Sequence, residues 1–103
     1  MAVIEISGNQ YELEVTEKAL DSIEEALGGS LLHTLQSQRG MLSVKHLKVI
    51  TSYALKNFEG GRIPPIKGME IAADWIREVG YTQVSQVVLE QIQKDLPFLF
   101  HTD

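Results

Sequence analysis

The residues that could carry acid–base or metal chemistry are few and widely spaced. There are three histidines, His33, His46 and His101, and no cysteine. No two of the histidines stand at the spacing of a zinc site, where ligands recur within a few residues. His33 and His46 fall among polar positions of expected helices, which is typical of surface histidines. The sequence therefore predicts no metal and no cofactor.

Nucleophile and phosphate-binding motifs are also lacking. No serine has the G-x-S-x-G context of an activated nucleophile, and Ser30 and Ser43 are explained as helix caps. Glu24 and Glu25 are neighbours on an expected helix, where side chains point about 100° apart, so we expect them to be solvated. The stretch 60–62, Gly-Gly-Arg, lacks the spacing of a phosphate-binding loop. We expect no enzyme, although a triad assembled from distant residues would leave no local signature.

The N-terminal residues predict a β-hairpin. Val3, Ile4 and Ile6 are apolar, and Tyr11, Leu13 and Val15 alternate with Glu12 and Glu14. Between the two runs lies the stretch 7–10, Ser-Gly-Asn-Gln, where Gly8 and Asn9 tolerate positive φ, as a tight turn requires. Two strands alone are marginally stable in water, so one face of the hairpin must pack on helices.

Residues 16–96 predict a bundle of about five helices. The expected N-caps are Thr16, Ser30, Ser43 and Thr82. Gly28 suits the left-handed position that ends a helix, so the pair Gly28-Gly29 is expected to fold the first helix back onto the short second one. The third helix is expected over 43–58, with apolar residues Val44, Leu47, Ile50, Ala54, Leu55 and Phe58. The other expected boundaries are Gly40, the proline-containing loop 60–65, Gly80 and Pro97.

The expected fold class is therefore α+β, mainly α, with an N-terminal β-hairpin packed on the helices. At 103 residues the chain is expected to be one domain, divided into a hairpin at 1–15, a helical bundle at 16–96 and a tail at 97–103. No apolar run reaches the roughly 20 residues of a membrane span, and the first residues do not resemble a signal peptide. The expected location is the cytoplasm.

The net charge of −5 is divided into blocks. Residues 1–27 carry seven acids and one base, 39–67 carry six bases and one acid, and 68–103 carry six acids and two bases, so −6 + 5 − 4 gives −5. The basic block raises a second function class, a small DNA-binding or regulatory protein of a mobile element. The overall acidity and the two prolines in loop 60–65 disfavour it, because a helix-turn-helix needs a short turn.

Two stretches resemble a known family. The first runs from YELEVT, residues 11–16, into ALDSIEEALGGSL, residues 19–31, and the second is LSVKHL, residues 42–47. In this order they resemble the small tail assembly chaperones of long-tailed phages, especially the type of prophages and gene transfer agents. The resemblance covers about residues 3–93 and rests on caps and core leucines. The Pro64-Pro65 loop and the aromatic tail after Pro97 depart from it.

The resemblance implies a non-enzymatic function. Such chaperones coat the long helical tape-measure protein, keep it soluble and help to recruit tail-tube subunits, and they are absent from the finished virion. The implied partners are therefore the tape-measure and tail-tube proteins, and the implied location is the host cytoplasm. In many members a ribosomal frameshift adds a C-terminal extension to a fraction of the chains.

The residues expected to bind partners lie in the basic block and the aromatic tail. They are Arg39, Lys45, Lys48, Lys56, Phe98 and Phe100. Charge blocks of opposite sign either neutralise each other within the fold or favour head-to-tail self-association. In the second case, added salt and a Lys45→Glu, Lys48→Glu double change should weaken the association. Association that persists in molar salt would favour the apolar tail instead.

Overall fold

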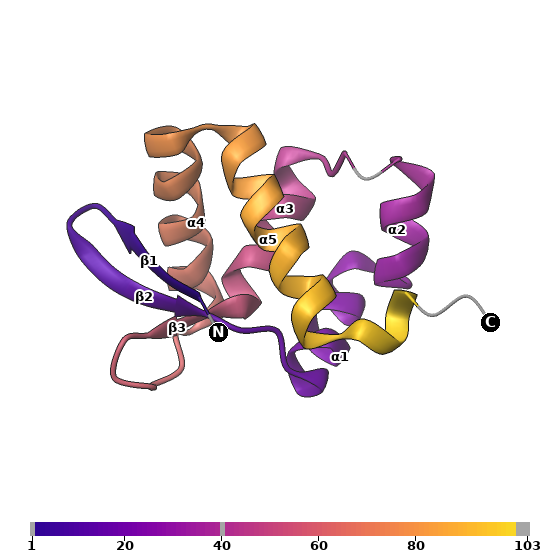
Figure 1. Cartoon of the computed structure of the whole chain (residues 1–103), viewed down its shortest axis with the longest axis horizontal. Helices are drawn as coiled ribbons and strands as arrows, with labels where there is room; N and C mark the ends of the chain where they lie inside the picture. The colour runs from indigo at the N-terminus through magenta and orange to yellow at the C-terminus, as the bar shows by residue number, and fades with distance from the viewer. Residues whose placement is uncertain (1, 40, 101–103) are drawn as a thin grey trace.

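The computed structural model describes residues 2–39 and 41–100. In chain order the elements are β1 (Ala2–Ile6), β2 (Asn9–Leu13), α1 (Glu17–Leu27), α2 (Leu31–Ser37), α3 (Val44–Ala54), β3 (Leu55–Asn57), α4 (Pro65–Val79), α5 (Tyr81–Asp95) and the 3-10 helix η1 (Pro97–Phe100). This confirms the predicted α+β, mainly α, fold. The sheet lies at one end of the long axis and α2 lies near the other (Figure 1). Gly40 and His101 lie outside the described residues.

The hairpin turn lies within the predicted stretch 7–10, but its positive φ values fall on Ser7 and Gly8 and not on Gly8 and Asn9. Ser7 and Gly8 have φ values of 52° and 80°, which makes a two-residue turn, and Asn9 already pairs with Ile6. The backbone N–H and the hydroxyl of Ser7 both donate to Glu78 Oε2, each at 2.7 Å. The end of α4 therefore holds the turn, and this explains why a serine occupies a left-handed position there.

The predicted helix over 43–58 is wrong at its C-terminal end. The helix stops at Ala54, and Leu55–Asn57 forms a third strand that pairs antiparallel with β2, with Leu13 opposite Leu55. The free edge of β2 provides the reason, because its backbone groups find partners in β3. The pairing continues past both strands in the hydrogen bond from Glu14 N to Ala54 O at 2.9 Å. Phe58, the last apolar residue of the expected helix, lies beyond β3 and is 51% exposed.

The turn between α1 and α2 confirms the predicted caps. Thr16 Oγ1 accepts from Ala19 N, Ser30 Oγ accepts from His33 N, and Gly28 is left-handed with φ 77°. The prediction that the Glu24 side chain is solvated is wrong. Its Oε2 accepts from Leu31 N at 2.8 Å, so this side chain crosses the double glycine and satisfies a free donor at the start of α2.

Replacing Gly28 with valine is expected to lower the free energy of unfolding by about 1–2 kcal/mol, because a β-branched residue fits a left-handed backbone badly. No heavy atom lies within 4 Å of a Cβ added at Gly28, so the whole cost comes from the backbone. Gly29→Ala is the matched control, since its added Cβ also meets open space. Urea unfolding of both variants measures the difference. Equal stability of the two would contradict the turn assignment.

The start of α5 also differs from the prediction. Thr82 was expected to be its N-cap, but α5 begins at Tyr81 directly after Gly80, and no side chain caps it. Gly80 has φ 93°, which lets one residue end α4 and open α5. Its carbonyl accepts from Val84 N at 3.2 Å. The Tyr81 hydroxyl donates to the carbonyl of Leu42 and so ties α5 to the segment before α3.

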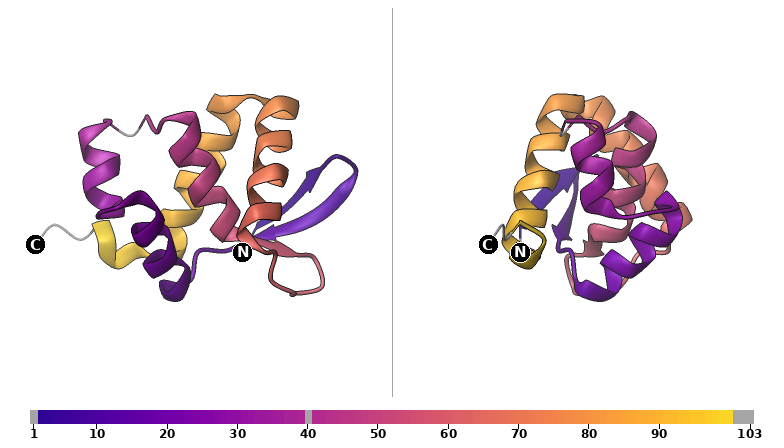
Figure 2. Two further views of the ribbon diagram at one scale, coloured as in Figure 1. Left: turned by 180° about the vertical axis from the view of Figure 1, so that it is seen from behind. Right: turned by 90° about the vertical axis from the view of Figure 1, so that its right-hand side faces the viewer.

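The hydrophobic core joins α1 and α2, the helices on either side of the double-glycine turn, to the sheet and to the later helices. Its fully buried large side chains include Ile6, Leu13, Val15, Ile23, Leu31, Leu47, Ile50, Val84, Val88, Ile92 and Leu96. The most extensive helix contact joins α3 to α4. At the C-terminal end of α5, Asp95 Oδ2 accepts from Val15 N and from Gln91 Nε2, each at 2.8 Å. The first of these bonds fixes the end of α5 to the linker before α1. Seen from behind, the hairpin projects past α4, away from α2 (Figure 2).

Candidate partner-binding surface

The residues first considered for chemistry have local structural roles. His33 is exposed, and His46 is half-buried with its Nδ1 3.3 Å from Gln38 Nε2. The hydroxyls of Ser30 and Ser43 cap α2 and α3. Within residues 2–39 and 41–100, no three histidine, aspartate or glutamate side chains gather in a way that could hold a metal ion.

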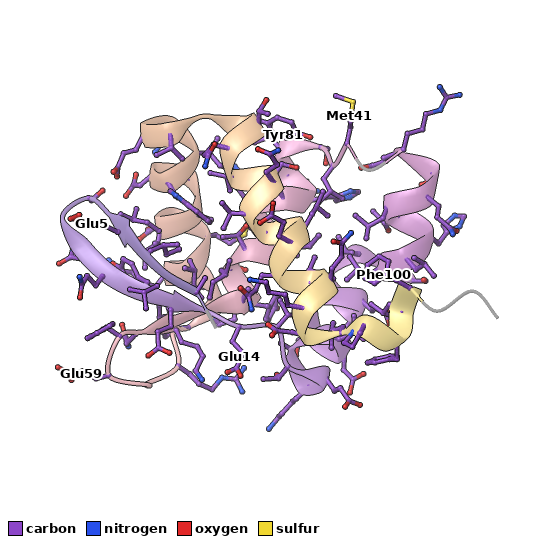
Figure 3. All side chains as sticks on the ribbon, in the orientation of Figure 1. Glu5, Glu14, Met41, Glu59, Tyr81 and Phe100 are labelled. Atoms are coloured by element: carbon purple, nitrogen blue, oxygen red, sulfur yellow. The ribbon has the colours of Figure 1, made fainter. Side chains whose placement is uncertain are left out.

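The six residues expected to bind partners do not form one surface. Arg39 follows α2 with φ 54°, and Lys45 and Lys48 lie on the first half of α3. Lys56 belongs to β3 near the other end of the molecule. The remaining two, Phe98 and Phe100, are 51% and 36% exposed in η1. Phe100 lies toward the end that carries α2, whereas Glu14, the partner of Lys56, lies nearer the sheet (Figure 3).

Part of the basic block is neutralised within the chain. Lys56 Nζ lies 2.8 Å from Glu14 Oε1, and the two side chains are 30% and 33% exposed. The hydrogen bond and the charge of Glu14 raise the pKa of Lys56 above its ordinary value. Lys67 also has a carboxylate partner, Glu70, at 3.9 Å. These pairs leave fewer cations for a partner than the sequence suggested.

An apolar hollow of about 220 Å³ lies where α1, α3 and α4 meet. Its lining residues are Ala26, Val49, Ser52, Tyr53, Pro65, Ile66 and Met69. Ile66 is 82% exposed, more than any other large apolar side chain of the described residues, whereas Tyr53 and Met69 are half-buried. Because Ile66 adjoins this hollow, it belongs to an apolar patch and is not an isolated surface residue.

A second hollow of about 220 Å³ continues the first along α3 toward β3. The two share Ser52, Tyr53 and Pro65 as walls, and together they form what we call the α3–α4 groove. The second part is more polar, since its walls include Arg62 and the paired Lys56 and Glu14. The groove thus has an apolar end and a charged end, which suits the apolar face of a helix that also carries polar groups.

A larger hollow, of about 610 Å³, lies between the hairpin turn and the loop after β3. It is lined by Gly8, Asn9, Gln10, Tyr11, Asn57, Phe58, Glu59 and Gly61. These residues belong to the ends of β2 and β3 and to the two turns, most of them are not apolar, and none of its walls is a helix. The smaller α3–α4 groove is therefore the better site for an apolar partner.

No protein-family model, curated protein or solved structure matches this chain. Function is therefore inferred from the groove and from the order of the sequence features. Among the helices of the described ranges, none has both the length and the apolar character that crossing a membrane requires.

Sequence reasoning missed the groove, although a signal for it exists. Ile66, Met69 and Ala73 recur at i, i+3 and i+7 on α4, and Val49 and Tyr53 recur at i and i+4 on α3. Both sets lie beside the buried stripes of their helices. A second apolar stripe on each of two adjacent helices indicates a groove only when the packing of the two helices is known.

Proposed function

We propose that this chain is a non-enzymatic tail assembly chaperone of a phage or prophage, which binds the tape-measure protein and helps the tail tube to assemble. It would act in the host cytoplasm and be absent from the finished virion. The observation that carries the proposal is the α3–α4 groove with the exposed Ile66 at its rim. The order of caps and core leucines that resembles the tail assembly chaperones supports the same function.

The groove suits an amphipathic helix because its apolar end is walled by side chains of α1, α3 and α4. Such a helix binds by laying residues at i, i+3, i+4 and i+7 into an apolar groove. A tape-measure protein is a long helix with an apolar face, so it offers this pattern many times. Tyr53 and Met69 would contact the apolar face of the bound helix, and Ile66 would cover its side.

The charged end of the groove favours an acidic group on the bound helix. Arg62 is exposed there, and no carboxylate of the described residues lies within 4 Å of its guanidinium. The first turn of α4 has no side-chain cap, so its free N–H groups add positive potential beside Arg62. Lys56 contributes less, because Glu14 compensates its charge.

Co-expression with the tape-measure protein of the same phage or prophage tests the proposal. We expect the tape-measure protein to be soluble and to co-purify with this chain, and to precipitate when it is expressed alone. An insoluble tape-measure protein in both cases would contradict the proposal. Retention of the chain on duplex DNA, lost at high salt, would instead favour the DNA-binding alternative.

A further inference from the structure

Strand β1 has a free edge. The strand order of the sheet is β1-β2-β3, so β1 has β2 on one side only (Figure 1). None of the described residues pairs with its other side, whereas the outer side of β3 is closed by a bridge from Lys56 to Arg62. The sequence of β1, AVIEI, contains no lysine, proline or bulge, and Glu5 is its one charged side chain, so little protects this edge strand from pairing.

The pairing register identifies which backbone groups face outward. Residues that flank a two-residue turn form a hydrogen-bonded pair, and such pairs alternate along the hairpin. Ile6 opposite Asn9 is therefore hydrogen-bonded, as is Ile4 opposite Tyr11. The N–H and C=O groups of Val3 and Glu5 must then point away from β2, toward the free edge.

We propose that two copies of this chain pair antiparallel through β1, about a twofold axis at Ile4. In this register Val3 of each copy lies opposite Glu5 of the other, so the outward groups of both residues form four backbone hydrogen bonds. The two Ile4 side chains meet on the face of the sheet that packs against α4. Each Ile4 then covers the part of the other Ile4 side chain that is exposed in a single copy. The result is a six-stranded sheet with both copies of α4 on one side, an interface that the proposed tape-measure groove does not use.

Charge selects this register over its neighbours. Moving the axis to Glu5 would place two Glu5 carboxylates directly opposite each other, and like charges in that position are destabilising. Moving it to Val3 would shorten the paired segment, because Val3 is the second residue of β1. The register at Ile4 keeps the two Glu5 carboxylates apart and does not shorten the paired segment. Each Glu5 faces the apolar Val3 of the other copy, which is 58% exposed on the outer face of the sheet.

Sedimentation velocity across a concentration series tests the pairing. The unchanged chain should dimerise, with a dissociation constant that changes little between low and molar salt. Val3→Pro should abolish the dimer, because it removes an outward N–H while leaving the β1–β2 ladder intact. Val3→Glu should raise the dissociation constant about tenfold, because each introduced carboxylate faces Glu5 of the second copy. Val3→Lys should leave it unchanged or lower it.

A double variant separates this contact from effects inside the hairpin. Val3 lies opposite Glu12 within its own chain, so Val3→Glu also adds a repulsion there. Combining Val3→Glu with Glu5→Lys keeps that repulsion but restores opposite charges between copies, and should restore the dimer. Circular dichroism must show that each variant is folded.

Three results would overturn the proposal: a chain that stays monomeric at its highest soluble concentration, a dimer unaffected by Val3→Pro, or a dimer lost in salt and through Lys45→Glu, Lys48→Glu. The last result would indicate that the copies associate through their oppositely charged sequence blocks and not through β1.

Discussion

Replacing Gly68 with valine is expected to lower the free energy of unfolding by about 3 kcal/mol, the largest effect on stability that we predict. Gly68 lies where α4 crosses α3. A Cβ added there would lie 2.9 Å from the carbonyl oxygen of Ser52, closer than real Cβ atoms approach, and 3.0 Å from the Ser52 Cβ, tighter than most real contacts. Because a backbone atom of α3 provides the nearest contact, the helices must move apart. Thermal unfolding should show a drop in Tm of roughly 10–20 °C.

Alanine at the same position separates packing from helix propensity. In an exposed helix, Gly→Ala stabilises by about 1 kcal/mol. At Gly68 we expect a net loss in spite of that gain, because the added methyl group meets Ser52. Gly61→Ala serves as a control outside the contact, since its nearest neighbour would be Asn57 Nδ2 at 3.4 Å. If Gly68→Ala raised the Tm, the close approach of α3 and α4 would be wrong.

Replacing Ile66 with glutamate is expected to have the largest effect on partner binding. Covering the exposed Ile66 side chain with the bound helix contributes about 2 kcal/mol to binding, so the dissociation constant for the tape-measure helix should rise about thirtyfold when this contact is lost. Folding should be unaffected, because Ile66 is 82% exposed and lies in the first turn of α4, where the helix dipole favours an acid. Fluorescence anisotropy with a labelled tape-measure peptide measures the change.

Val44→Glu is the matched control for this variant. Val44 is 49% exposed and also lies in the first turn of its helix, α3, but it does not line the groove. The same change in charge and local position should therefore leave binding intact. If Val44→Glu weakened binding as much as Ile66→Glu, net charge and not the groove would control the affinity.

Local signals in the sequence predicted most of the helix boundaries. Thr16, Ser30 and Ser43 cap their helices as expected, and Gly28 is left-handed, because caps depend on side chains and φ values within a few residues. The failures lie where a distant segment decides the structure. Leu55–Asn57 continues the helical apolar pattern of α3, but it becomes a strand because β2 offers it backbone partners.

Two further local errors have the same origin. Glu24 appeared solvated because adjacent carboxylates diverge on a helix, yet the reversed chain direction after Gly28 brings the backbone N–H of Leu31 to it. Within the predicted turn 7–10, positive φ was expected at Gly8 and Asn9, the residues with the stronger turn preference. Ser7 takes the left-handed position in place of Asn9, held by Glu78 from α4, 71 residues away in the chain.

The partner-binding residues were harder to predict than the fold. Cations such as Lys45 and Lys56 share a sequence block, but the structure places one on α3 and pairs the other with Glu14. Ile66 begins the second apolar stripe of α4, but from sequence alone an apolar residue after two prolines is as easily explained as a core residue. Its role depends on the packing of α1, α3 and α4, which creates the hollow beside it.

The most direct test of the proposed function is to map the bound surface by NMR. A peptide from the apolar stripe of the tape-measure protein would be titrated into isotope-labelled protein while backbone amide shifts are followed. We predict the largest changes at Val49, Tyr53, Ile66 and Met69, with little change in η1 or in the first turn of α3. Shifts confined to Phe98 and Phe100, shifts confined to Lys45 and Lys48, or no saturable shifts would contradict binding in the α3–α4 groove.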